Sequence, residues 1–380
     1  MINEISIHNF KSIVSLDLEL GRFNVIIGPN GCGKSNILEA ISFASAAAQN
    51  KLDYEYLVNR DVRMSDPKFM VNAFDDEDCK IKDSNRIVIH IYNHDNSHSY
   101  QVYFDEVSKK WVNAIDKFLH HLQNEKEVSV KLSSESGNGE TGITDSEQME
   151  RLKKLLENLM SPTSDLTNFL IYRPTEHFLR KTFETSIFPL GVHGEGLLKY
   201  LKEAVGEKNV ALFEEINEGL GLLDWFDGFQ IPDDLLTNEY RLAIGDRFLK
   251  DSLHYFDEKS TNEGFLFLLF YLTLFNSKDT PRFFAIDNIE SALNPKLMTK
   301  LTDYLVRRTF ANDKQVIVTT HSPFVLDALD LSNDDVRLFV ARRNIDGHTR
   351  LERIPYREDR TMKLSQLWMS GLIGGLPDNF

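Results

Sequence analysis

The feature that most constrains this fold is a glycine-rich segment at residues 28–35, which reads GPNGCGKS. An apolar stretch, 23–27, precedes it, and an apolar pattern at helical spacing, 36–41, follows it. Strand, glycine-rich turn and helix form the setting in which a G-x-x-x-x-G-K-[ST] motif binds phosphate. The turn's backbone N–H groups and the N-terminus of the helix would face the phosphate oxygens. The segment therefore predicts a nucleotide-binding α/β domain.

The side chains of this motif have separate expected roles. Lys34 would reach the β- and γ-phosphates, and Ser35 would bind Mg²⁺. The predicted cofactors are therefore ATP and Mg²⁺. We place these neighbouring residues at the nucleotide as well: Asn30, Gly31, Cys32, Gly33 and Asn36.

Composition excludes several classes of protein. The 380 residues carry a net charge of −15, so a nucleic-acid contact would need a local basic patch or a partner. The two cysteines, Cys32 and Cys79, imply neither a disulfide framework nor a metal cluster. We find no apolar run that could span a bilayer and no signal peptide, and we expect a cytoplasmic protein without a membrane contact.

The last third of the chain alternates between strands and helices. Apolar runs at 283–286, 315–319 and 336–340 are typical of buried strands, and 295–309 and 323–329 have helical patterns. Such alternation predicts a mostly parallel sheet flanked by helices. A long apolar helix is expected over 263–276.

The first part of the chain predicts an antiparallel β region instead. Two short strands fit the first twenty residues, and 87–92 and 100–104 predict a hairpin. Further on, 124–148 is typical of a flexible excursion and 147–160 of a helix. We divide the chain into an N-terminal ATPase lobe, 1–108, an inserted mostly helical region or lid, 109–250, a C-terminal lobe, 251–345, and a tail, 346–380. The tail is expected to dock on the core or a partner, with Trp368 and Leu372 buried.

A second motif group follows the predicted strand 283–286. Asp287 ends this strand, at the sheet edge where ligands gather in parallel sheets. On its own, an aspartate there is more often a turn residue or a helix cap. A functional role for Asp287 is indicated by two later segments, Ser-Ala-Leu-Asn-Pro at 291–295 and Thr-Thr-His-Ser-Pro at 319–323.

Together these motifs resemble ABC-type ATPases of the SMC, RecF and OLD group (the AAA_21 family). The opening segment 5–12, which includes Lys11, is similar to that group's N-terminal I-x-N-F-[KR]-S pattern, and 190–197 resembles a segment of its lid region. Within the group, the chain resembles ATPase subunits of bacterial anti-phage defence systems such as PtuA of Septu.

The resemblance implies residue roles and a dimer. Asp287 would be the Mg²⁺ carboxylate, His321 would sense the γ-phosphate, and Lys11 would contact the nucleotide. The loop 291–294 would touch the active site of the other subunit. Two chains related by a two-fold axis would complete two sites around ATP.

Two positions depart from the family pattern. Asn288 stands where the family usually has a glutamate that acts as general base, and an amide cannot accept a proton at neutral pH. Glu290 lies two residues further on and matches another common family glutamate, and we count Asn288, Glu290 and His321 as the candidate catalytic residues. Since losing a general base typically costs ~10²–10⁴ in rate, slow or partner-dependent hydrolysis is expected.

The second departure is the signature loop. In the family this loop binds the γ-phosphate held by the opposite subunit. The best match, 260–264, places Asn262 where serine is usual and keeps Gly264, so the resemblance implies that these two residues contact the nucleotide. An ordinary helix start capped by Ser260 or Thr261 explains the same residues.

These features support an ATPase that dimerises around ATP and regulates an effector, a nuclease or toxin, in antiviral defence. The alternatives are an ATP-sensing scaffold with little hydrolysis, a RecF-like DNA-repair ATPase and, less well supported, a P-loop kinase. The chain shows no nuclease constellation, so cutting would belong to another protein. Contact with nucleic acid stays open.

Overall fold

The computed structural model describes residues 1–74, 85–94, 96–114, 164–181, 187–233, 235–236, 239–250, 253 and 255–376. The flexible excursion expected at 124–148, the helix expected at 147–160 and Cys79 lie outside these ranges. The chain divides into two compact units. The first comprises Met1–Glu19, Asn36–Phe169 and Arg343–Arg350, and the second comprises Leu20–Ser35, Leu170–Arg342 and Leu351–Phe380. These units are cut differently from the four segments expected from the sequence, which stay a prediction.

The first unit is built on an antiparallel sheet with the strand order β2-β1-β4-β5-β6. Apolar residues alternate along its strands, as in the cross-strand pairs Ile7 with Leu16 and Ile7 with Ile89. The expected N-terminal strands and hairpin are confirmed, and β6 is an addition. The strands are β1 (Ile2–Phe10), β2 (Ile13–Glu19), β4 (Arg86–Asn93), β5 (Ser97–Asp105) and β6 (Lys110–Asn113).

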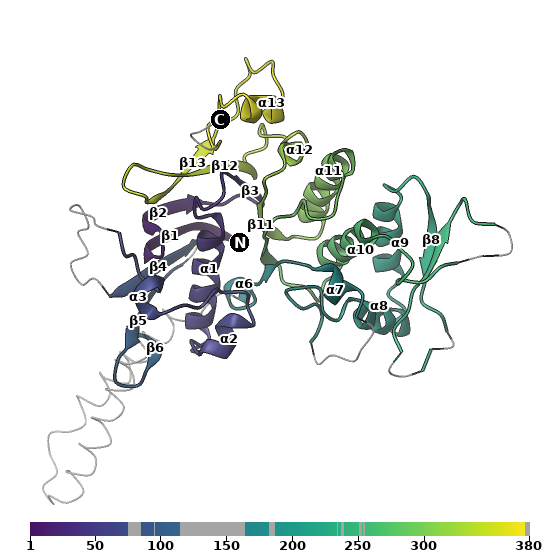
Figure 1. Ribbon diagram of the computed structural model, residues 1–380, viewed down its shortest axis with the longest axis horizontal. Coiled ribbons are helices and arrows are strands. Elements are labelled where there is room, and N and C mark those ends of the chain that lie inside the picture. The colour runs from purple at the N-terminus through teal and green to yellow at the C-terminus, as the bar shows by residue number, and fades with distance from the viewer. Residues whose placement is uncertain are drawn as a thin grey trace, which may run out of the picture. The chain divides into compact units, whose positions relative to one another are not determined.

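Helix α1 (Lys34–Ala48) packs on this sheet through its apolar face (Figure 1). The ring of Phe43 contacts Phe10 and Trp111, with centroids 5.7 and 5.3 Å apart. Short helices complete the unit: α2 (Tyr54–Val58), α3 (Pro67–Met70) and α6 (Ser164–Thr167).

The second unit contains the expected parallel sheet, with the strand order β13-β12-β3-β11-β10-β7. Strands β7, β10, β11, β3 and β12 run parallel, and β3, β10 and β11 are buried at every position, as their mostly apolar sequences require. The edge strand β13 was not predicted. The strands are β3 (Phe23–Ile27), β7 (Ile171–Tyr172), β10 (Phe283–Ile286), β11 (Gln315–Thr319), β12 (Val336–Arg343) and β13 (Thr349–Ile354).

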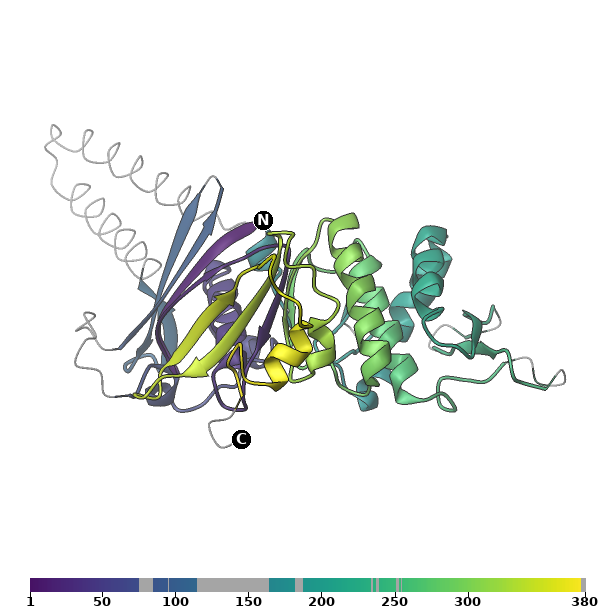
Figure 2. The same cartoon turned by 90° about the horizontal axis from the view of Figure 1, so that it is seen from above.

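Helix α10 (Glu263–Asn276) is apolar on all sides because it is enclosed by other elements. Helices α9 (Val210–Leu220) and α11 (Pro295–Ala311) pack against it, as both views show (Figures 1 and 2). The remaining elements of the unit are α7 (Glu176–Leu179), α8 (Leu197–Gly206), β8 (Phe226–Gln230), β9 (Ala243–Asp246), α12 (Pro323–Leu326) and α13 (Leu364–Met369). Whether α8 and α9 belong to a lid stays a prediction.

The C-terminal tail packs within the second unit. Trp368 of α13 is buried, as expected, whereas the Leu372 side chain is 68% exposed and is not buried against the core; its burial against a partner stays a prediction. Leu372 follows the turn that ends α13 and points away from the core that Trp368 joins. A Cβ added at Gly375 would lie 2.8 Å from Val340 and 3.6 Å from the Cα of Gly28, so the tail reaches the start of the phosphate loop.

Among the described residues, no helix combines the length and the apolar character needed to cross a membrane.

Candidate functional site

The glycine-rich segment forms a tight loop between β3 and α1. Gly28, Gly31 and Gly33 have φ angles of 149°, 76° and 104°, which favour glycine. A Cβ on Gly28 would lie 2.2 Å from the carbonyl oxygen of Ala341, so no larger residue fits there. The loop therefore has the backbone shape that its motif predicts.

Lys34 points back into this loop. Its Nζ donates to the carbonyl oxygens of Gly28 (2.9 Å) and Pro29 (3.1 Å) and lies 3.8 Å from the sulfur of Cys32. Burial lowers the pKa of Lys34, while nearby thiol and carboxylate groups act in the opposite direction. A buried ammonium group held mainly by neutral carbonyls is a strong anion-binding group.

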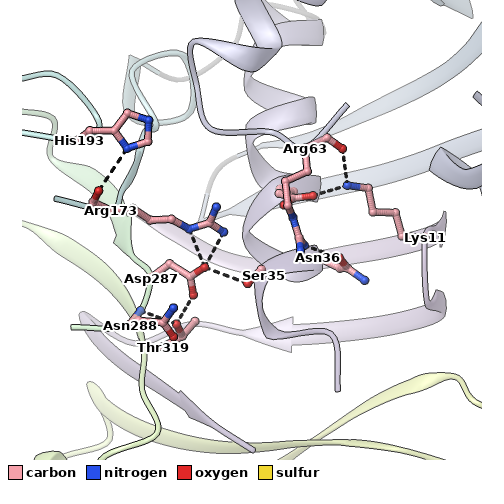
Figure 3. Close-up of polar contacts among 10 residues, drawn as sticks. Lys11, Ser35, Asn36, Arg63, Arg173, His193, Asp287, Asn288 and Thr319 are labelled. Atoms are coloured by element: carbon pink, nitrogen blue, oxygen red, sulfur yellow. Dashed lines mark hydrogen bonds and ion pairs between the residues drawn. The ribbon is translucent and has the colours of Figure 1, made fainter. Parts of the chain in front are cut away.

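Asp287 is the centre of a hydrogen-bond cluster below the loop (Figure 3). Its Oδ2 accepts a bond from Ser35 Oγ (2.8 Å), and its Oδ1 accepts one from Thr319 Oγ1. Arg173 donates from Nε and Nη2 to the same Oδ2, at 2.8 and 2.5 Å. Burial alone would raise the pKa of Asp287, but Arg173 and the donated hydrogen bonds hold this pKa below its ordinary value.

These groups fit the cofactors that the motif implies. The Ser35 hydroxyl and the Asp287 carboxylate are adjacent oxygen donors, the type of ligand that Mg²⁺ prefers. The loop above them offers backbone N–H groups and Lys34 to a phosphate chain. The structure thus brings Asp287 next to Ser35, which stands 252 positions earlier in the sequence and directly follows Lys34.

Arg173 and Thr319 were not recognised in the sequence as part of this cluster. A signal for Arg173 existed: it directly follows the short apolar strand β7, as Asp287 follows β10. Ile286 pairs with Tyr172 in parallel register, so the next residue of each strand lies at the same edge of the sheet. Thr319 ends β11 in the same way.

Asn288 and Glu290 follow the cluster in different settings. Asn288 is exposed and has a left-handed backbone, with φ of 58°, and its N–H donates to Thr319 Oγ1 at 3.0 Å. Both carboxylate oxygens of Glu290 accept hydrogen bonds, from Thr320 Oγ1 (2.7 Å) and from the His321 N–H (2.9 Å). Glu290 therefore holds the backbone that carries His321.

His321 lies after β11 on the exposed side of this turn. Burial of its ring and the nearby Lys34 ammonium lower the pKa of His321, against the pull of Glu290 and Asp287. The lowered pKa favours the neutral imidazole, which has one N–H donor and one acceptor.

Asn262 is the N-cap of α10. Its Oδ1 accepts a bond from the Phe265 N–H at 2.9 Å, so the cap is Asn262 itself, and the alternative with Ser260 or Thr261 as the cap is wrong. A Cβ on Gly264 would lie 3.2 Å from the carbonyl oxygen of Ala292. The signature-like turn thus packs against the segment 291–294. The roles of Asn262 and Gly264 toward a nucleotide stay predictions.

Lys11 and Asn36 belong to a network in the first unit (Figure 3). The buried Glu39 carboxylate pairs with both Lys11 and Arg63. Asn36 donates to Ser12 Oγ (2.7 Å) and accepts from Arg63 Nη2 (3.0 Å). Both residues have protein partners, and their predicted contact with the nucleotide stays a prediction. Within the loop 28–35, Asn30 is exposed and Cys32 is buried.

Comparisons with known proteins identify a family and a fold for this chain. A family model described as "AAA domain, putative AbiEii toxin, Type IV TA system" matches residues 23–327. None of the curated proteins matches the chain.

Solved structures share the fold. One is a crystal structure of the Smc head bound to the C-winged helix domain of ScpA, with a TM-score of 0.56 and 15% identity over 93% of this chain and 98% of that one. Another is the Smc head domain with an extended coiled coil bound to the C-terminal domain of ScpA derived from Pyrococcus furiosus, with a TM-score of 0.52 and 15% identity over 93% and 96%. The expected α/β fold is confirmed, and it resembles the fold of an Smc head.

Proposed function

The chain belongs to the family of AAA domains described as putative AbiEii toxin, Type IV TA system, and we propose that it is an ATPase that controls a partner protein in bacterial antiviral defence. ATP with Mg²⁺ would bind on the loop 28–35 and would hold two copies of the chain together. The partner would be a nuclease or toxin that acts in the cytoplasm. The description of the family names a toxin–antitoxin system, which supports a system of two proteins, this chain and its partner.

One observation carries the ATPase proposal: Ser35 Oγ lies 2.8 Å from Asp287 Oδ2, directly after the loop that buries Lys34. This joins a phosphate-binding loop to an oxygen-donor pair for the metal. When bound, Mg²⁺ would neutralise charge on the phosphate oxygens. Lys34 would bind the β- and γ-phosphates, and the neutral His321 would donate to or accept from the γ-phosphate region.

Hydrolysis is proposed to be slow. The Asn288 amide can orient a water molecule but cannot take its proton. Both oxygens of Glu290 are already engaged with Thr320 and His321, which disfavours Glu290 as a replacement base.

The lack of an available base at Asn288 and Glu290 favours a second candidate, an ATP-sensing scaffold that hydrolyses little. In that case nucleotide binding alone would set the state of the partner. Measured turnover separates the two candidates, because a scaffold would release the partner without phosphate release.

A partner surface is consistent with the fold. The two Smc heads in the solved structures are each bound to a domain of ScpA. We propose that this chain likewise binds a separate protein. Purification of the chain together with its neighbouring gene product, with and without ATP, tests this association.

Nucleotide binding is tested with a fluorescent, non-hydrolysable ATP analogue in the presence of Mg²⁺. Lys34→Ala should weaken binding ~10-fold or more, because a charge-assisted contact to phosphate is lost. The exposed Lys68 gives a matched control, and Lys68→Ala should bind like the wild type. Equal affinity of Lys34→Ala and the wild type would contradict the proposed site.

A further inference from the structure

The strongest unassigned contact lies inside the site itself. The guanidinium group of Arg173 and the carboxylate of Asp287 form an ion pair, with side chains 24% and 2% exposed. Two nitrogens of Arg173 and the hydroxyl of Ser35 all point at one oxygen, Asp287 Oδ2. This is the oxygen that lies next to the Ser35 hydroxyl, and thus next to the other expected metal ligand.

A metal ion and this guanidinium group compete for the same place. Mg²⁺ requires its oxygen ligands at about 2.1 Å in octahedral geometry, directly or through bound water. An oxygen that already accepts two N–H bonds and one O–H bond has no lone pair left for that ion or its water. The two cations would also repel each other at such a separation.

We propose that Arg173 and Mg²⁺ are alternative cation partners of Asp287, so that Arg173 sets the Mg²⁺ concentration at which the nucleotide complex forms. The inference rests on the proposed ATP site and concerns a residue with no role in the sequence motif. Arg173 acts as a positioning residue in the metal-free state, since it holds the carboxylate charged and in place.

The backbone of Arg173 is fixed, so the exchange takes place through the side chain. Its N–H donates to the carbonyl oxygen of Val192 at 2.7 Å, and its own carbonyl oxygen lies 3.2 Å from His193 Nδ1. The side chain keeps partial access to solvent, in contrast to Asp287. With Mg²⁺ bound at Asp287, the guanidinium could turn toward the phosphate chain, because a guanidinium group binds phosphate as readily as it binds a carboxylate.

The test measures binding and does not depend on turnover. The fluorescent, non-hydrolysable ATP analogue is titrated into wild type and Arg173→Ala, first in EDTA and then at a series of Mg²⁺ concentrations. Arg173→Ala should lower the half-saturating Mg²⁺ concentration ~10-fold, because Asp287 loses a charged competitor. In EDTA the same variant should bind the analogue several-fold more weakly, since the Asp287 charge then faces the phosphates uncompensated.

These opposite signs distinguish competition from a structural role. A merely structural loss would weaken binding in both conditions, and an unchanged or raised Mg²⁺ requirement would overturn the inference. Asp287→Asn gives a second check: in that background, Arg173→Ala should no longer lower the Mg²⁺ requirement. If it still does, the competition is not for Asp287 and the inference fails.

Control variants keep the test decisive. Arg282 directly precedes β10, at the end of the strand opposite to Asp287, and pairs with Asp313. Arg282→Ala should therefore leave the Mg²⁺ requirement unchanged. If Arg173→Ala does not fold, Arg173→Lys replaces it. Lysine keeps the positive charge but loses the paired N–H donors of the guanidinium, so the Mg²⁺ requirement should fall by a smaller factor. An Mg²⁺ requirement that does not fall would contradict the inference. Failure of the wild type to bind the analogue at any Mg²⁺ concentration would instead refute the proposed function.

Discussion

The backbone at Asn288 suits an asparagine. Its φ of 58° lies in the left-handed region, which asparagine tolerates better than most residues with a side chain. A glutamate there would carry a conformational cost of about 1 kcal/mol. Asn288 therefore fits an easily formed turn, and its amide cannot act as a general base.

Restoring the base should raise turnover despite this cost. Asn288→Glu is expected to increase phosphate release at saturating Mg²⁺ and ATP by at least ~10-fold, since a positioned base typically contributes ~10²–10⁴. Asn288→Gln has a side chain of the same length without a base and should stay at the wild-type rate. Turnover that is unchanged in Asn288→Glu, with melting showing a folded protein, would contradict the assignment.

A loss of activity in Glu290→Gln would carry a different message. It would mean that Glu290 takes part in hydrolysis even though its oxygens bind Thr320 and His321 in this structure.

Strands β10 and β11 connect the site at their carboxyl ends to a buried lysine at their other ends. Lys314 is 2% exposed and donates to Thr280 Oγ1 at 2.8 Å. Burial, and secondarily the charge of Arg282, lower its pKa to about 7. The unfolded chain keeps an ordinary lysine and binds more protons than the native state from pH 7 to about pH 10.

Stability should therefore rise with pH over that window. Lys314 alone is expected to add about 2 kcal/mol to the free energy of unfolding between pH 7 and pH 9. Lys314→Met should remove this contribution of about 2 kcal/mol, because position 314 then no longer titrates. Urea unfolding followed by circular dichroism at pH 7, 8 and 9 measures the slope. Lys278→Met, at an exposed lysine nearby, should keep the slope of the wild type.

Elements with a strong local pattern were predictable, and those with a weak one were not. Strands β10 and β11 are unbroken apolar runs, and α10 and α11 begin at asparagine caps. Strand β13 reads TRLERI, and its charged residues hide it because it is an edge strand with exposed positions.

The candidate site shows the same division. Ser35 and Asp287 carry motifs, so their roles could be assigned before any contact was known. Arg173 pairs with a residue 114 positions away, and only the parallel register of β7 and β10 brings the two together. Such a pairing depends on tertiary structure, which no local pattern records.

For the whole molecule, the proposed assembly depends on the turn at Asn262. The side-chain oxygen Oδ1 of Asn262 caps α10, and the residue is exposed. An exposed amide on a helix N-terminus can donate to a phosphate held by another copy. One chain would then supply the loop and the other the turn.

This assembly predicts a mass change that depends on the nucleotide. In sedimentation velocity, the wild type should shift toward a dimer with Mg²⁺ and a non-hydrolysable ATP analogue, and Asn262→Arg should remain monomeric because its bulk blocks the contact. Asn262→Ser keeps a capping oxygen and should still dimerise. A single mass for the wild type with and without the analogue, together with normal ATPase activity of Asn262→Arg, would contradict the dimer.

The approach of Gly375 to Gly28 has a consequence for synthesis. A ribosome makes the phosphate loop early and the residues that pack against its first glycine almost 350 positions later. The neighbouring parallel strands also arrive late. A nascent chain therefore carries its nucleotide motif through most of translation without the surroundings that shape it, and the loop is completed only when the tail has been added.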